Sequence, residues 1–163
     1  MRIENKLAEL GFVLPPAPEP PPGFQFAFEW ARVRGNRVYL SGHAAQNPDG
    51  TLAGPFGKVP SQVSVDDACD AARSAALSMI ASVARAVGDL DRVTAWLNVS
   101  GMVNADSGFH HTTVVLNSFS DLILCVFGPQ IGAHARTAVG VQSLPLDNVV
   151  IVAAELEIDG DVP

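Results

Sequence analysis

The spacing of apolar residues divides the chain into stretches with either helical or strand periodicity. Apolar side chains recur every three to four residues and predict helices over 3–10, between Ser64 and Gly88, and over 109–127. Runs rich in β-branched and aromatic residues predict strands over 24–33, 37–44, 92–104, 135–144 and 148–158. After the short first helix the order is β-β-α-β-α-β-β, and one more short strand early in the chain is an open alternative.

Local signals at the ends of these stretches support the assignment. Ser64 with Asp67 three residues later is a capping pair, and Gly88 is a suitable C-terminal stop. The tripeptide Arg34–Asn36 predicts a tight hairpin, and the proline-rich residues 14–23 predict an extended surface connector. Helices on one face of a mixed sheet make the expected fold class α+β.

Composition narrows the classes of protein that need consideration. The 163 residues suit one domain, and 48% apolar with 17% charged residues hints at apolar surface hidden between subunits. A net charge of −7 argues against a nucleic-acid partner, since such a surface needs clustered Lys and Arg. No uninterrupted apolar run approaches the roughly 18 residues of a membrane span, and the charged N-terminus is unlike a signal peptide. We therefore expect a cytoplasmic protein with no membrane partner.

Metal and redox chemistry find little support in the pattern of residues. Cys69 and Cys125 are far apart in predicted helices, which indicates buried thiols rather than a disulfide or a metal pair. His110 and His111 are adjacent, so on a helix their rings would diverge by about 100° and could not share one ion. We expect no metal and no cofactor.

Arg136 is unusual because it lies inside an apolar, small-residue strand, "GAHARTAVGV". A guanidinium keeps its proton at any ordinary pH, so a buried or half-buried one needs a partner. The partner can be a structural acid such as Glu155 or Glu157, or an anion from outside the chain.

Three segments of the chain resemble the RidA/YjgF family, long described as endoribonuclease L-PSP. They are "GNRVYLSGHAAQNPDG", "AVGDLDRVTAWLNVSGMVN" and "HARTAVGVQSLPLDNVVIVAAELEI", and they occur in the family's order. The resemblance starts near residue 24. It implies an N-terminal helix and proline-rich connector over 1–23, typical of a longer branch, and a RidA-like domain over 24–160.

The resemblance also implies an assembly and a reaction. The family's fold is chorismate-mutase-like, with two main helices on one face of the sheet, and it forms a homotrimeric barrel with clefts between subunits. In the best understood branch these clefts hydrolyse reactive 2-imino or enamine acids to 2-keto acids and ammonia. Arg136 matches the arginine that binds the substrate carboxylate, a role that suits its planar fork of donors.

Other positions of the cleft match less well. The glutamate that handles water in the family corresponds to Ile151, and Glu155 lies four residues further on, about 13 Å along a strand. Phe28 replaces a tyrosine, and His43 replaces a glutamine and is a candidate general base. Polar groups near Ser41 and Thr137 and a side chain on the second long helix, either Asn117 or Ser120, complete the implied site.

Two functions from different classes remain open. The chain is a hydrolytic deaminase in which Arg136 binds the carboxylate and His43 assists catalysis, or it is a non-catalytic trimeric binder of small carboxylates. Arg136 supports both, whereas Ile151 in the glutamate's place favours the second.

Overall fold

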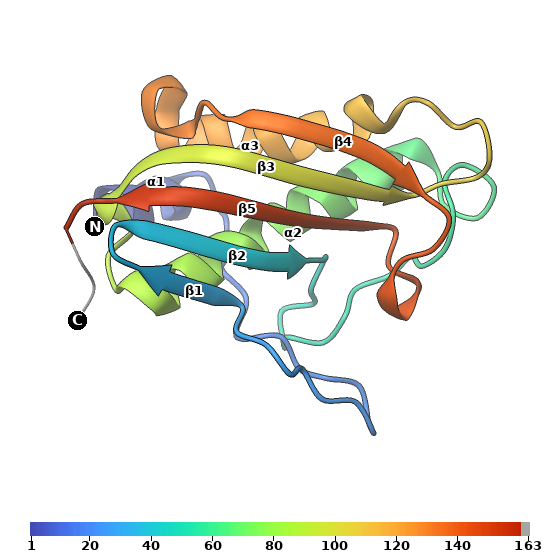
Figure 1. Ribbon diagram of the computed structural model, residues 1–163, viewed down its shortest axis with the longest axis horizontal. Helices are drawn as coiled ribbons and strands as arrows, with labels where there is room; N and C mark the ends of the chain where they lie inside the picture. The colour runs from blue at the N-terminus through green and yellow to red at the C-terminus, as the bar shows by residue number, and fades with distance from the viewer. Residues whose placement is uncertain (161–163) are drawn as a thin grey trace.

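A five-stranded mixed sheet with helices on one face forms the centre of the computed structural model, which describes residues 1–160 (Figure 1). The strands are β1 (Ala31–Arg34), β2 (Arg37–His43), β3 (Val93–Asn104), β4 (Ala135–Val141) and β5 (Val150–Ile158). Their order across the sheet is β1-β2-β5-β3-β4, and only β3 and β4 run parallel. β1 and β4 are therefore the two edges of the sheet.

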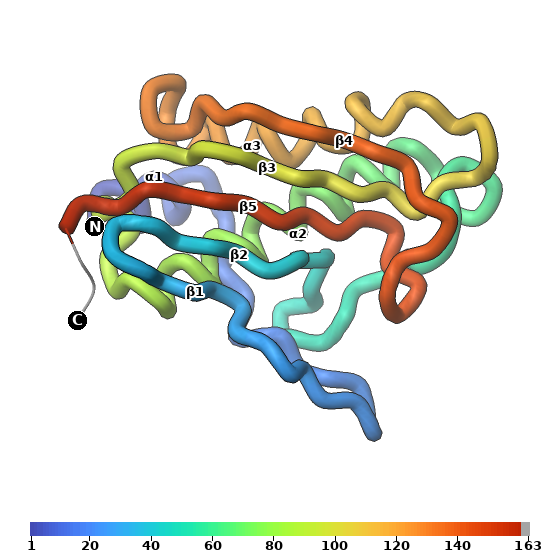
Figure 2. Tube along the Cα trace, viewed as in Figure 1, coloured from blue at the N-terminus to red at the C-terminus, as the bar shows by residue number. Residues whose placement is uncertain are grey.

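The helices lie together behind the sheet and leave its other face open (Figure 2). They are α1 (Arg2–Glu9), α2 (Val65–Val87) and α3 (Thr112–Gly132), with short 3-10 turns η1 (Leu90–Arg92) and η2 (Pro145–Asp147). By length and composition α3 could cross a membrane, but it packs on β3, β4 and α2 as a core helix.

Strand periodicity sorts the side chains between the two faces. On β5, Val150, Val152 and Leu156 are buried against the helices, while Ala153 and Glu155 lie on the open face. The alanine-rich side of α2 is completely buried, which is possible because small side chains allow a helix to approach a sheet closely. The expected α+β architecture is therefore confirmed for the single chain.

The predicted strand over 24–33 is wrong for most of its length. Only Ala31–Arg34 joins the sheet, and residues 24–30 have no regular secondary structure. Their aromatic side chains do alternate, but the backbone of residues 24–30 forms no strand, although the Trp30 carbonyl accepts from the Ser41 amide of β2 at 3.1 Å. The rings line a cavity instead. In the hairpin that follows, Gly35 takes a positive φ of 58° and Asn36 does not.

Three smaller expectations also need correction. The second long helix does not end at Gly128, because after a break with φ of 79° a last turn continues to Gly132. Cys69 and Cys125 are free thiols on helices, as expected, but Cys69 is half-buried and Cys125 is exposed. His110 and His111 precede α3 instead of lying on it, and their rings are 4.4 Å apart.

The packing of α3 on the sheet makes a prediction about Gly101. A Cβ at this position of β3 would lie 2.4 Å from Leu116 of α3, which is fully buried. We expect Gly101→Ala to lower the free energy of unfolding by about 1–3 kcal/mol in urea denaturation, as overpacked cores do. Leu116→Ala should remove the clash, so the double variant should lose less than the sum of the two single losses; additive losses would contradict this contact.

Candidate functional site

Arg136 lies near the start of the edge strand β4, and its side chain is bound by two residues of α3. Nη1 donates to the Ser120 hydroxyl at 2.9 Å, and Nη2 donates to Asn117 Oδ1 at 3.0 Å. The sequence alone could not choose between Asn117 and Ser120, and the structure brings both to the guanidinium. They are one helical turn apart, so they face the same strand.

His134 extends this cluster and was not among the residues selected from the sequence. Its Nδ1 lies 2.6 Å from the Gly132 carbonyl, which can only accept, so Nδ1 carries the proton. In the neutral ring, Nε2 then accepts from the Ser120 hydroxyl at 2.8 Å. His134 thereby orients Ser120 toward Arg136. The sequence did contain a signal for His134: it lies two residues before Arg136, and in an extended segment this spacing puts both side chains on the same face.

The guanidinium has no carboxylate partner within residues 1–160. Glu157 accepts from Thr94 and pairs with Arg37 at 3.7 Å, and neither Glu155 nor Glu157 reaches Arg136. Arginine has five N–H donors, and the two neutral oxygens use two of them. Three donors and the full positive charge therefore remain available at the edge of the sheet.

Thr137 and Ser41 lie away from this cluster. Thr137 follows Arg136 on the strand, so its exposed side chain projects to the opposite, open face of the sheet. Ser41 is on β2, where its hydroxyl donates to the Glu29 carbonyl at 2.7 Å. Their roles as ligand-binding groups stay predictions.

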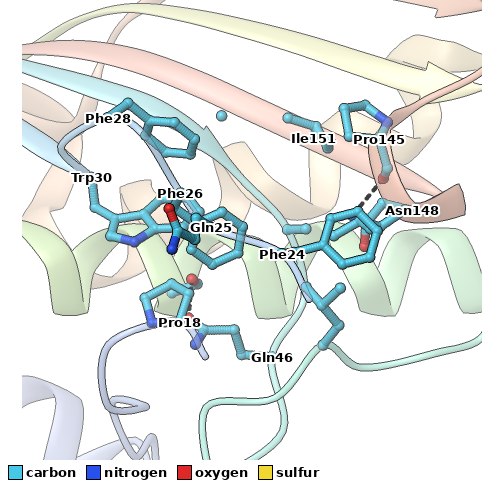
Figure 3. A pocket seen from close by; sticks show the side chains of 15 residues that line it. Pro18, Phe24, Gln25, Phe26, Phe28, Trp30, Gln46, Pro145, Asn148 and Ile151 are labelled. Carbon is cyan, nitrogen blue, oxygen red and sulfur yellow. Dashed lines mark hydrogen bonds between the residues drawn. The ribbon is translucent and has the colours of Figure 1, made fainter. Parts of the chain in front are cut away.

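A second region, here called the aromatic pocket, lies beyond the end of β2 and the start of β5 (Figure 3). It is a cavity of about 510 Å³, which is within the range of small-molecule sites. Phe26, Phe28 and Trp30 meet there, with ring centroids 4.8 to 5.7 Å apart. Phe28 therefore faces a cavity.

Ile151 forms part of the wall of the aromatic pocket. It is largely buried, and a Cβ on Gly42 would lie only 2.5 Å from its Cγ2 atom, so the isoleucine fills the space beside this glycine. The side chains described along the wall include no Asp, Glu, Lys, Arg or His. Glu155 lies on the same face of β5 as Ile151, as predicted. It lies beside Tyr39 and Asn98, however, and is outside the pocket.

His43 lies in the core and is completely buried, although its predicted role required access to a ligand. Nδ1–H donates to the Ser41 carbonyl at 2.5 Å, and Nε2 accepts from Ser82, whose hydroxyl in turn accepts from Arg85. The pKa of the His43 imidazole is lowered to about 4, mainly by burial; the bond to the Ser41 carbonyl opposes this shift, and the nearby Arg85 charge adds to it. This geometry gives His43 a structural role and no access to a reacting water.

The Arg136 cluster and the aromatic pocket are separate places in one chain. β4 and β2 are three strand spacings apart, about 14 Å, with β5 and β3 between them. Arg136 also points to the helical face, whereas Ile151 alternates with the helix-facing Val150 and Val152 and so lies on the other face of β5. A small ligand cannot touch both regions of the same copy.

Among the described residues, one cluster of carboxylates has a spacing suitable for a metal ion. Glu4, Asp89 and Asp91 have carboxylate oxygens close together. These oxygens lie 2.8 to 3.2 Å from the ammonium of Met1, so the positive charge that they surround is already supplied by the chain.

Comparison with known proteins identifies relatives over almost the whole chain. Protein TCP17 of Trypanosoma cruzi is 35% identical over 97% of this chain and 95% of its own length. The crystal structure of Atu1372 from Agrobacterium tumefaciens, a protein of unknown function, is 34% identical with a TM-score of 0.83, covering 96% of this chain and 92% of its own. A candidate endoribonuclease from Shewanella oneidensis is 26% identical with a TM-score of 0.85, over 96% and 99%.

More distant structures share the fold. RidA from an Antarctic Psychrobacter is 22% identical with a TM-score of 0.56, covering 87% of this chain and 94% of its own. No family model matches the sequence.

The buried imidazole of His43 predicts a dependence of stability on pH. Between pH 6.5 and 4 the unfolded ring binds a proton that the folded ring does not, so stability should be complete above pH 6.5 and fall as the pH is lowered. At 1.36 kcal/mol per pKa unit, the loss is on the order of 3 kcal/mol.

Urea denaturation at pH 7.5 and 4.5 measures this loss. His43→Gln should lose distinctly less stability on acidification than the unmodified protein. The matched change at an exposed histidine, His110→Gln, should leave the dependence intact. Equal pH dependence in all three proteins would contradict the buried neutral ring.

Proposed function

The chain belongs to the RidA/YjgF (endoribonuclease L-PSP) family, and we propose that it binds small 2-oxo or 2-imino carboxylates through Arg136. The observation that carries the proposal is the set of hydrogen-bond partners of the Arg136 guanidinium. Two neutral oxygens hold it in place, and no carboxylate of residues 1–160 neutralises it. A carboxylate from outside can accept two parallel charge-assisted hydrogen bonds from the remaining donors.

The binding site is completed by a second copy of the chain. We propose the homotrimer expected from the family, with each cleft formed by the Arg136 cluster of one copy and the aromatic pocket of its neighbour. The open sheet face supports self-association, because it leaves Tyr39 and Val139 more than 40% exposed. We place this trimer in the cytoplasm, with neither nucleic acid nor membrane as a partner.

Hydrolytic deamination of 2-imino acids is the second candidate function. Family membership and the retained Arg136 favour it, since carboxylate binding is the first step of that reaction. Water must also be directed at the C=N carbon, a task that a carboxylate or imidazole performs well. Ile151 and the uncharged wall of the pocket supply neither group, and His43 is buried. We therefore propose binding as the first candidate function and hydrolytic deamination as the second.

The proposal predicts the effect of removing the charge at position 136. Arg136→Gln should weaken the affinity for 2-oxobutanoate at least tenfold in titration calorimetry. A hydrogen bond to a charged group contributes about 1.5–3 kcal/mol, and 1.4 kcal/mol is a factor of ten in affinity. Arg73→Gln, which removes a surface arginine paired with Asp70, should bind normally. Unchanged binding by Arg136→Gln would exclude this site.

Restoring an acid at position 151 separates the two functions. The unmodified protein should accelerate hydrolysis of 2-iminopropanoate, generated in place by an amino-acid oxidase, only weakly. Ile151→Glu should raise the rate at least tenfold, because general acid–base catalysis typically contributes about 10²–10⁴-fold. Ile151→Gln controls for polarity without an acid. Fast hydrolysis by the unmodified protein with no gain from Ile151→Glu would make the deaminase the correct function.

A further inference from the structure

The segment Phe24–Trp30 contains more aromatic surface than an irregular segment needs for packing. It contains three of the chain's eight phenylalanines and one of its two tryptophans. Phe24 and Phe28 are 55% and 50% exposed. Apolar surface of this size left in water usually indicates a binding site.

The aromatic side chains of this segment surround a defined cavity instead of covering the core. Figure 3 shows Phe28 and Trp30 on one side, Ile151 and Pro145 on another, and Phe24 and Phe26 along the segment between them. The cavity of about 510 Å³ is much larger than the methyl or ethyl side chain of a small 2-oxo acid. Such a side chain would leave most of the aromatic surface in water.

The wall of the pocket offers contacts mainly to apolar groups. Most of its polar side chains are already engaged: the Ser78 hydroxyl donates to Gln46, and Asn148 donates to the Pro145 carbonyl at 2.9 Å. Because no charged side chain lines the wall, the pocket cannot neutralise a carboxylate. The uncharged end of a ligand therefore fits there, and its acid group must lie elsewhere.

The pocket is held open by bonds to the proline-rich connector. Gln46 Nε2 donates to the carbonyls of Pro16 and Gly50, both at 3.2 Å. Arg85 donates to the Pro15 carbonyl at 3.3 Å, and the Glu19 amide donates to Gly50. Because these contacts fix the wall before binding, less ordering is needed when a ligand enters.

We infer that the aromatic pocket receives a bulky apolar side chain, aromatic or branched, of the carboxylate that Arg136 binds. The inference rests on the proposed function and specifies its substrate class. Acids with large side chains fill the pocket of one copy while the carboxylate reaches Arg136 of the next. The residues between the first helix and β1 thereby set the specificity of the site.

Titration calorimetry with a graded series of 2-oxo acids tests the inference on the full chain. The series is pyruvate, 2-oxobutanoate, 4-methyl-2-oxopentanoate and phenylpyruvate. We expect affinity to rise along it, by about fourfold for each buried methylene. Equal affinity for all four acids, or tightest binding of pyruvate, would overturn the inference. Arg136-dependent binding would then still support the proposed function.

Two variants assign the selectivity to the pocket. Phe24→Ala removes a largely exposed ring of the wall and should weaken phenylpyruvate about tenfold more than it weakens pyruvate. Phe56→Ala removes an exposed ring outside the pocket and should change neither affinity. Selectivity that survives Phe24→Ala, or is lost equally in Phe56→Ala, would overturn the role of the pocket. If no acid binds, or if Arg136→Gln binds all four normally, the proposed function itself fails.

Discussion

A guanidinium that is fixed in position but not neutralised by any carboxylate of residues 1–160 is the interaction on which the proposed function depends. Arg136 cannot lose its proton, so its charge must be balanced by water, by the chain or by a ligand. Ser120 and Asn117 bind it through neutral oxygens, and His134 orients Ser120. An acid at either helix position would have made a closed ion pair. The neutral partners instead fix the direction of the fork and preserve its charge, which the proposed function assigns to an incoming carboxylate.

The sheet explains why the proposed site requires more than one copy. The strand order puts β4 and β1 at opposite edges, so the charged cluster and the aromatic pocket cannot serve one small ligand within a chain. Arg136 supplies a positive charge, and the described wall of the aromatic pocket supplies apolar surface with no charged side chain. Joining them between neighbouring copies would give a cleft that recognises both ends of an amphipathic acid.

Residue patterns predicted most of the scaffold, because core burial imposes a period on each strand and helix. The capped start of α2 and the long strand β3 both followed from the sequence. Residues 24–30 were misjudged, since alternating aromatics look the same whether a backbone pairs in a sheet or lines a cavity. His43 was misjudged because its exposure depends on α2, which supplies Ser82. His134 was missed because its partner is distant in sequence.

A crystal structure of the protein with 4-methyl-2-oxopentanoate tests the central claim most directly. The predicted result is a carboxylate within about 2.7–3.0 Å of two guanidinium nitrogens of Arg136, the distance of charge-assisted hydrogen bonds. The branched side chain should lie against Phe24 and Ile151 of a neighbouring copy. A ligand bound elsewhere, with Arg136 contacting only Ser120 and Asn117, would contradict the claim.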